Sequence, residues 1–186
     1  LIMLLPISLI IKICYMITGD FKSIFYTQKR IGKNGKFIYI YKFRSMVPNA
    51  DEVLKELLKD PKYKKEWNKN QKLDDDPRIT KIGKIIRKTS LDEVPQFINV
   101  FKGDMSLIGP RPLVEGELDS HNGNHEIYEK VKPGITGWWA CNGRNATTYE
   151  QRLKLEYYYA ENASLSLDIK CIFRTIKAVI SKSGAK

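Results

Sequence analysis

The sequence has few of the residues that bind metals or form covalent cross-links: of 186 residues, three are cysteine and two are histidine. Cys14, Cys141 and Cys171 are odd in number, widely spaced and outside any paired motif. This pattern excludes a disulfide framework and indicates free thiols in a reducing compartment. His121 and His125 are four residues apart, but the Asn-Gly-Asn between them predicts a loop and not a helical zinc site.

A long hydrophobic run is also missing. Residues 1–17 are apolar except for Ser8, Lys12 and the helix-breaking Pro6. At about 1.5 Å per residue they reach only ~25 Å, less than the ~30 Å hydrocarbon core of a bilayer. No basic region precedes this run and no small-residue cleavage site follows it, which argues against a signal peptide.

The chain begins with leucine inside this apolar run, so we expect further sequence upstream. Three interpretations of the run are open. It is the end of a spanning helix, a buried core helix, or a helix that enters and leaves the membrane on one side. Pro6 would supply the bend for the third, because proline frees a backbone carbonyl.

Acidic residues are in deficit, with 21 Asp and Glu against 32 Lys and Arg, a net charge of +11. Such a balance favours an anionic partner, which could be nucleic acid, an acidic membrane surface or a phosphorylated substrate. No nucleic-acid-binding motif is present, and the glycine spacing at residues 32–36 does not match a phosphate-binding P-loop. Internal repeats are not visible, and 186 residues suit one domain.

Two strands are predicted on either side of a tight turn. Residues 23–31 and 37–43 flank Asn34-Gly35, a pair favoured in hairpin turns. In the second segment aromatic residues alternate with isoleucine and lysine, which is the period of a strand. We therefore expect an antiparallel hairpin. Lys42 and Arg44 would leave it on the same side, either as solvated charges or as phosphate contacts.

Several segments have the spacing of amphipathic helices. Residues 49–60 begin with a capping-box pattern at Asn49 and end at Pro61. Residues 62–76 are strongly charged, and we expect a solvated excursion there. Residues 79–88 combine isoleucine with lysine and arginine. Such a helix can lie on an anionic membrane or pack on a core, and the sequence alone does not decide between them.

The C-terminal part is predicted to contain a short strand and two helices. Residues 113–130 are polar and loop-like, and a strand is expected within residues 132–137, before two adjacent tryptophans. Thr147 and Thr148 are candidate caps of the next helix. The last helix has a predicted buried stripe with basic residues beside it. The stripe consists of Ile169, Ile172, Phe173, Ile176, Val179 and Ile180.

The most informative stretch predicts one short amphipathic helix. Ser90 can cap it, and Glu93 three residues later completes a capping box. Apolar residues recur at helical spacing as far as Gly103, with Pro95 in the first turn. Asp92 and Glu93 would then lie side by side at the positive end of the helix dipole.

Two interpretations of Asp92 and Glu93 are open. Acidic residues are common in a first turn, and capping alone explains Glu93. However, Arg87 and Lys88 precede the pair, and Arg111 follows it between two prolines. A carboxylate at a helix N-terminus, flanked by arginines, suits a site where a phosphate and a divalent cation meet.

Motifs along nearly the whole chain resemble the bacterial sugar transferases, the monotopic phosphoglycosyl transferases. They are Thr-Gln-Lys-Arg-Ile-Gly at 27–32, Tyr-Lys-Phe-Arg-Ser-Met at 41–46, Ser-Leu-Asp-Glu-Val-Pro-Gln at 90–96, Lys-Gly-Asp-Met-Ser at 102–106, Gly-Pro-Arg-Pro at 109–112, Lys-Pro-Gly-Ile-Thr-Gly at 132–137 and Asn-Gly-Arg-Asn at 142–145. Single motifs are weak, but together in the family's order they are specific. The insertion at 62–76 resembles the undecaprenyl-phosphate hexose-1-phosphate transferase branch, whose members often carry a multi-span region upstream.

The resemblance implies a mixed α/β fold, a small antiparallel sheet surrounded by amphipathic helices. It implies a re-entrant membrane helix in residues 1–20 and a cytosolic catalytic domain in residues 21–186. It also implies a location on the cytoplasmic face of the bacterial inner membrane. The sequence leaves the oligomeric state open.

The resemblance further implies transfer of a phospho-sugar from a nucleotide-diphosphate sugar, with a UDP-hexose expected, to polyprenyl (undecaprenyl) phosphate. This would be the first membrane step of polysaccharide or glycoconjugate assembly. Asp92 is implied as the nucleophile of a covalent intermediate and Glu93 as its metal-site or acid–base partner, with Mg²⁺ held by both. The implied substrate-binding residues are Arg87, Arg111, Lys42, Arg44 and Arg144.

Two rival functions belong to other classes. A nucleic-acid-binding module would explain the charge and the aromatic residues, but the basic residues lie on apolar-striped helices and an apolar leader is not needed. A catalytically silent membrane-surface protein would not require Asp92. We expect membrane lipid, and not nucleic acid, as a partner.

Overall fold

The computed structural model describes residues 4–70, 73–143 and 147–180. These residues form two compact units. One is built from residues 4–26 together with the described residues of 43–94. The other is built from residues 27–42 and the described residues from Pro95 onward. The fold is mixed α/β as predicted, and each unit is described in turn.

The first unit is helical. Its elements are α1 (Leu4–Ile17), α2 (Ala50–Leu57), α3 (Pro61–Asn70), α4 (Lys81–Lys88) and the 3-10 turn η2 (Leu91–Glu93). Its core contains Ile11, Tyr15, Ile24, Phe43 and Ile86. The Tyr15 hydroxyl donates a 2.6 Å hydrogen bond to the Arg44 carbonyl, which joins α1 to the segment after residue 43.

Helix α1 is packed on one face only. Ile11 and Tyr15 are buried, whereas its exposed apolar side chains are Leu5, Leu9, Ile10, Ile13, Met16 and Ile17. The interpretation of this run as a buried core helix is therefore wrong. Pro6 lies in the first described turn of α1, and residues 1–3 lie outside the described residues. Within the described chain, no helix combines the length and the apolar character needed to cross a membrane, and the re-entrant helix stays a prediction.

The charged excursion predicted at 62–76 is partly wrong. Helix α3 occupies its first half, with Pro61 as the first residue, because proline fits the first turn of a helix. Near its end Asp76 is buried against Arg78, with oxygen–nitrogen distances of 2.8 and 2.7 Å. Helix α2 begins after Asn49 as predicted, but the Asn49 side chain makes no capping bond.

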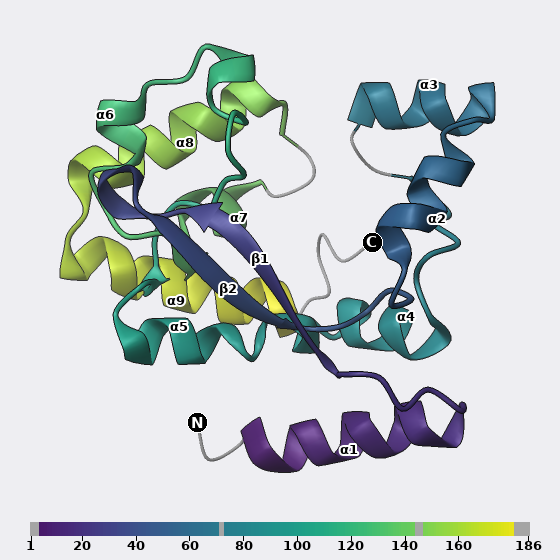
Figure 1. Ribbon diagram of the computed structural model, residues 1–186. Coiled ribbons are helices and arrows are strands. Elements are labelled where there is room, and N and C mark those ends of the chain that lie inside the picture. Colours follow the sequence, from purple (N-terminus) through teal and green to yellow (C-terminus); the bar gives the residue numbers. More distant parts are fainter. Residues whose placement is uncertain (1–3, 71–72, 144–146, 181–186) are drawn as a thin grey trace. The chain divides into compact units, whose positions relative to one another are not determined.

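The second unit contains most of a hairpin. Strands β1 (Phe25–Ile31) and β2 (Phe37–Phe43) pair with each other and form a long ribbon (Figure 1). The turn between them has positive φ angles at Asn34 (57°) and Gly35 (71°), so the predicted hairpin is confirmed. Helix α5 (Gln96–Lys102) packs on β2 through the buried Asn99. Its amide bonds the Tyr41 N–H and the Tyr39 carbonyl at 3.0 and 2.7 Å.

A second sheet was not predicted. Strands β3 (Ser106–Ile108) and β4 (Gly134–Thr136) pair in parallel. The crossover between them contains the 3-10 turn η3 (Asp119–His121) and helix α6 (His125–Tyr128), so the expected loop at residues 113–130 is only partly a loop. The tryptophans after β4 begin helix α7 (Trp138–Asn142) and do not lie on a strand.

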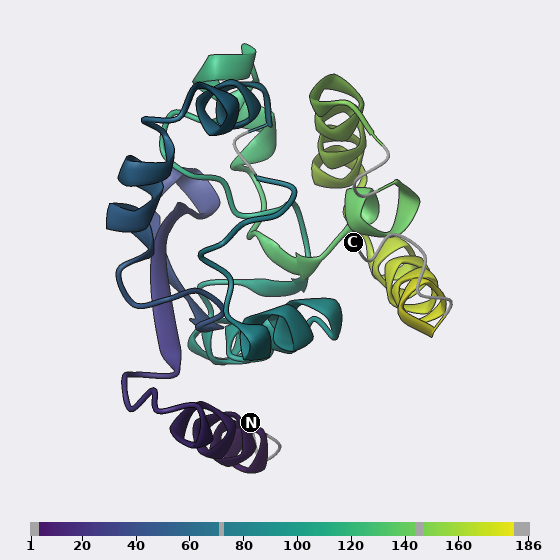
Figure 2. The same ribbon diagram turned by 90° about the vertical axis from the view of Figure 1, so that its right-hand side faces the viewer.

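Helices α8 (Tyr149–Asn162) and α9 (Leu165–Ile180) complete the unit, and α7 contacts both (Figure 2). Thr148 caps α8 in a capping box with Gln151, which confirms the predicted cap. The predicted buried stripe of α9 is wrong, because Leu167 and Cys171 face the core instead. The exposed members of the predicted stripe are Ile169, Ile172, Phe173 and Ile176, and the side chains of Val179 and Ile180 lie outside the described residues.

Candidate active site

The acidic pair lies on η2 and not in the first turn of a longer helix. Ser90 has a left-handed φ of 56° and its side chain makes no capping bond, so the predicted capping box with Glu93 is wrong. Pro95 explains the break, because its ring would crowd the carbonyl of Leu91 if one helix contained both residues. Helix α5 therefore begins only after Pro95.

Apolar side chains anchor the turn on both sides of the pair. Leu91 and Val94 pack against the core of the first unit, which includes Tyr15 of α1. Asp92 and Glu93 lie between these anchors and are half-buried. The two carboxylates are thus held on a short, fixed segment that reaches the surface.

Arg87 is positioned by an unusually close approach of α4 to the chain at Ser45. A β-carbon on Gly83 would lie 1.8 Å from the Ser45 carbonyl oxygen, so only glycine fits at this position. Thr80 caps α4 by accepting the Gly83 N–H at 2.9 Å. One turn after Gly83, the Nε of Arg87 donates a 2.8 Å hydrogen bond to the Ser45 hydroxyl. The guanidinium is therefore oriented just before the acidic pair.

Arg44 has a structural environment. Its side chain is buried, donates to the carbonyls of Ser23 (2.7 Å) and Met46 (3.1 Å), and pairs with Asp20 at 2.9 Å. Burial opposes ionisation of Asp20, but the hydrogen bond from Lys22 and the Arg44 guanidinium lower the pKa of its carboxyl. The structure thus places Arg44 inside the first unit and not on an open surface.

The remaining predicted substrate-binding residues besides Arg111 are Lys42 and Arg144. Lys42 is half-buried near the end of β2, so Lys42 and Arg44 do not leave the strand as a matched solvent-facing pair. Arg144 lies outside the described residues.

Arg111 belongs to the second unit, on a loop that three glycines bring against β4. A β-carbon on Gly109 would lie 2.3 Å from the Lys132 carbonyl oxygen, and one on Gly134 or Gly137 would lie 2.1 Å from a backbone atom of Gly109. The Gly109 N–H bonds the Thr136 carbonyl at 2.9 Å. The loop is therefore rigidly seated.

Three contacts fix Arg111 itself. Its N–H donates to Glu156 Oε1 at 3.2 Å, and its carbonyl accepts the Tyr128 hydroxyl at 2.9 Å. Its guanidinium pairs with Glu117 at 3.1 Å, while the side chain stays 42% exposed. Arg111 is consequently oriented and still accessible to a ligand.

Glu117 is shared by three arginines. Besides Arg111, its carboxylate lies 3.3 Å from Arg152 and 3.9 Å from Arg30. Burial opposes its ionisation, but Arg111, the Val114 N–H and the other arginines lower the pKa of Glu117. The cluster carries more positive than negative charge and favours an anionic ligand.

Sequence reasoning missed this cluster. Glu117 and Tyr128 lie in the segment that we expected to be a polar loop. For Arg152 and Glu156 the only signal in the sequence was their spacing of four residues, which places both on one face of a helix.

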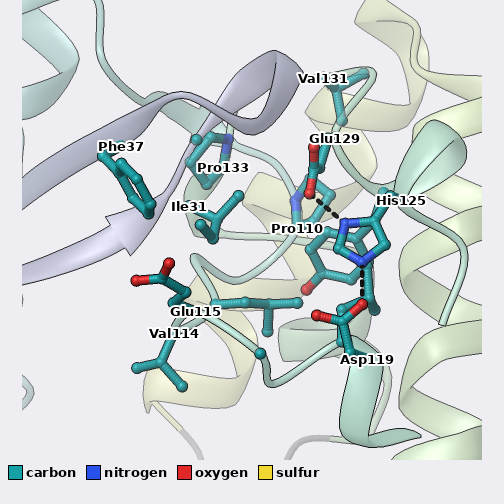
Figure 3. A pocket seen from close by; sticks show the side chains of 15 residues that line it. Ile31, Phe37, Pro110, Val114, Glu115, Asp119, His125, Glu129, Val131 and Pro133 are labelled. Atoms are coloured by element: carbon teal, nitrogen blue, oxygen red, sulfur yellow. Dashed lines mark hydrogen bonds and ion pairs between the residues drawn. The ribbon is translucent and has the colours of Figure 1, made fainter. Parts of the chain in front are cut away.

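A cavity of about 120 Å³ lies beside the Arg111 loop. Figure 3 shows His125 at its edge between two carboxylates, with Nδ1 2.6 Å from Glu129 and Nε2 2.7 Å from Asp119. The hydrogen bonds to these carboxylates raise the pKa of His125. Pro110 and Tyr128 line the cavity, whereas the described candidate site residues do not.

The Asp92–Glu93 pair has the donor chemistry that Mg²⁺ prefers. Mg²⁺ usually takes one or two carboxylates and completes its shell with substrate phosphates and water. Among the described residues no group of three or more His, Cys, Asp or Glu could hold a metal. Two adjacent carboxylates match the number of protein ligands that Mg²⁺ takes when phosphates and water complete its shell.

Three known bacterial proteins are similar in sequence to 90% or more of this chain. The undecaprenyl-phosphate galactose phosphotransferase of Salmonella typhimurium is 47% identical over 186 residues, all of this chain and 39% of that protein. The UDP-galactose-lipid carrier transferase of Erwinia amylovora is 47% identical over 184 residues, 98% of this chain and 38% of that protein. The exopolysaccharide production protein ExoY of Sinorhizobium fredii is 44% identical over 168 residues, 90% of this chain and 74% of that protein.

The chain spans about two fifths of the first two relatives. Their names agree with the hexose-1-phosphate transferase branch that the insertion indicated. Residues 1–182 match the family described as Bacterial sugar transferase, and this range contains all seven motifs quoted above. With its acidic pair, its arginines and its motifs in the family's order, the chain belongs to the bacterial sugar transferase family.

Proposed function

We propose that this chain is the catalytic part of a phosphoglycosyl transferase. It would move a hexose phosphate from a UDP-hexose to undecaprenyl phosphate, as the first membrane step of polysaccharide assembly. Family membership over residues 1–182 and the names of the relatives support this. The observation that carries it is the half-buried Asp92–Glu93 pair on an anchored turn that begins shortly after α4, the helix of Arg87.

The reaction would proceed in two displacements at one phosphorus. The Asp92 carboxylate attacks the β-phosphorus, the bond from that phosphorus to the bridging oxygen breaks, and the nucleoside monophosphate leaves with the electron pair. A phosphate oxygen of the lipid then attacks the same phosphorus and displaces Asp92, giving polyprenyl diphospho-sugar. Adjacent residues cannot both face one phosphorus equally, so Glu93 supports the attack.

Asp92 and Glu93 would also hold Mg²⁺. When bound, the cation neutralises charge on the diphosphate. Both side chains are hard oxygen donors on one turn, and this fits the ion. Arg87, whose guanidinium is oriented by Ser45, would hold phosphate oxygens as charge moves to the leaving group. The family resemblance implies the same role for Arg111, whose guanidinium is oriented by Glu117.

Each unit presents an apolar face that suits a membrane surface. In α1 this face includes Leu5, Leu9 and Ile17, exposed at 77%, 62% and 79%. In α9 the exposed Phe173 lies among lysine and arginine residues, a pattern typical of helices on anionic lipid. We propose the cytoplasmic face of the inner membrane as the location, with α1 as a re-entrant helix.

The test is a screen of nucleotide-sugars with undecaprenyl phosphate and Mg²⁺, reading released nucleotide. UDP-galactose is the first substrate to try, because one relative is named for UDP-galactose and another for galactose. We expect release that requires the full reaction mixture and is lost in Asp92→Asn. If no nucleotide-sugar gives release, or if Asp92→Asn retains it, the proposed function is wrong.

A further inference from the structure

We propose that Glu156 is a positioning residue that holds the backbone of Arg111, so that the guanidinium meets the substrate phosphates in one orientation. Glu156 lies on α8, far from Arg111 in sequence, and none of the family motifs quoted above contains it. The effect on turnover rests on the proposed function. The effect on the Arg111 backbone does not.

The sequence of the loop explains why a single carboxylate can hold the backbone of Arg111. In Gly109-Pro110-Arg111-Pro112 the two prolines have no N–H. The Arg111 N–H is therefore the only backbone donor of the Pro-Arg-Pro segment, and Glu156 Oε1 accepts it at 3.2 Å. The Tyr128 hydroxyl bonds the Arg111 carbonyl at 2.9 Å, so the backbone is held on both sides of the Cα atom.

The residues that hold the Arg111 backbone also contact the residues around the Arg111 guanidinium. Arg152 lies 3.9 Å from Glu156 and 3.3 Å from Glu117, and one of its nitrogens lies 3.4 Å from the Tyr128 hydroxyl. Glu117 in turn holds the Arg111 guanidinium at 3.1 Å. A change at Glu156 therefore acts on the loop and not on a distant surface.

Packing alone does not explain a carboxyl group at this position. Glu156 is 1% exposed, and within the described chain its Oε2 has no hydrogen-bond partner. Replacing a whole buried ion pair by apolar residues of similar volume is often neutral or stabilising, so packing does not require this carboxyl group. The contact to Arg111 supplies a reason for the carboxyl group.

The strength of this contact depends on the charge of Glu156. Burial raises the pKa of Glu156 to about 7, against the opposing influence of the Arg111 N–H and the Arg152 and Arg111 guanidiniums. Tyr128 also faces it, and burial together with Glu156 raises the pKa of that phenol. An ionised carboxylate accepts a stronger hydrogen bond than a neutral one, so the hold on Arg111 tightens as pH rises through about 7.

The first test follows the Arg111 amide proton by NMR in the full chain. Its chemical shift should change with pH with a midpoint near 7 in the wild type and stay constant in Glu156→Gln. The matched control is Glu161→Gln, an exposed glutamate on the same helix, which should titrate like the wild type. A wild-type Arg111 amide that does not respond between pH 5.5 and 8.5, a range of about 1.5 units on either side of the expected midpoint, would overturn the proposal without any variant.

The second test measures turnover with UDP-galactose, undecaprenyl phosphate and Mg²⁺. Glu156→Gln should lower kcat by about 10-fold to 100-fold, the scale for loss of a supporting contact, and should flatten the pH profile near 7. In an Arg111→Ala background the same change should have almost no further effect, because no guanidinium remains to be oriented. If Glu156→Gln lowers kcat by the same factor in the wild type and in Arg111→Ala, Glu156 has only a structural role and the proposal is wrong. An inactive wild type would refute the proposed function and leave the amide test decisive for Glu156.

Discussion

The Nε of Arg87 lies 2.8 Å from the Oγ of Ser45, and this hydrogen bond joins α4 to the chain just after β2. The contact depends on Gly83, since a β-carbon there would lie 1.8 Å from the Ser45 carbonyl oxygen. Helix α4 ends at Lys88, and the turn that carries Asp92 and Glu93 begins at Leu91. The close approach at Gly83 therefore sets the position of the arginine and of the turn that follows.

Gly83→Ala should destabilise the first unit by about 1–3 kcal/mol or more, because the added methyl group forces α4 away from Ser45. The unfolding temperature of the purified protein measures this. Lys84→Ala is the matched control, since Lys84 is 64% exposed on the same helix and such substitutions usually change stability by less than about 0.5 kcal/mol. Equal unfolding temperatures for both variants would contradict the tight packing at Gly83.

Arg111→Ala should lower turnover by roughly 10²-fold or more, the scale for loss of a group that stabilises transition-state charge. Released nucleotide measures the rate at saturating substrate. Lys64→Ala, on the exposed face of α3, should have almost no effect although it removes the same charge. If the two variants lose the same activity, Arg111 acts only through the net charge of the protein and the site is misplaced.

Asp76 should make stability depend on acid. Burial opposes its ionisation, but the side-chain and backbone hydrogen bonds of Arg78 lower the pKa of Asp76. A carboxyl whose folded pKa is lowered stabilises the protein above its unfolded pKa of about 3.9, and this stability is lost as pH falls below that value. Asp76→Asn should cost about 3–5 kcal/mol at neutral pH, since Arg78 stays buried without its counter-ion.

The matched control for Asp76 is Asp75→Asn, because the Asp75 side chain is 97% exposed. Urea unfolding at pH 7 and at pH 3.5 would compare the two variants. We expect the Asp76 variant to lose most of its stability at pH 7 and to respond less to acid than the wild type. A wild-type response for Asp76→Asn would show that the pair with Arg78 does not contribute.

The apolar leader should have both flanks in the cytoplasm. Its exposed face is apolar along α1, and Lys12 donates to the carbonyls of Phe21 and Lys22 at 2.9 and 3.1 Å, so the segment after α1 folds back against the helix. Single cysteines placed before residue 1 and at Thr18 in the full-length protein would be labelled with a membrane-impermeant reagent. Labelling of the upstream position only from the periplasmic side would mean a spanning helix and would contradict the re-entrant arrangement.

Local signals in the sequence predicted the hairpin and the ends of several helices. Asn34-Gly35 specified the turn, Thr148 specified the start of α8, and Gly103 ends α5 with a φ of 82°. These features depend on neighbouring residues only. The parallel pairing of β3 and β4 was not predictable, because each strand has three residues and shows no period.

Whether a charged residue is buried or exposed was harder to predict from the sequence. The polarity of a segment does not distinguish a solvated aspartate from one paired inside the protein, as Asp76 and Glu117 show. On α9 both faces carry apolar residues, and the face containing Leu167 and Cys171 packs inward. The position of Asp92 and Glu93 between Arg87 and Arg111 indicated a phosphate and cation site from the residues alone. Their individual roles came from the family resemblance and stay predictions.

The covalent step is the central claim, and it is tested without the lipid acceptor. The enzyme is mixed with Mg²⁺ and a UDP-sugar labelled in the sugar, and the protein is then isolated under denaturing conditions. The account predicts about one label per active site, with release of an equal amount of UMP, and no label on Asp92→Asn, which keeps the shape of the side chain but removes the nucleophile. An unlabelled wild-type protein that releases UMP only when both substrates are present would contradict the account, because the lipid phosphate would then attack directly.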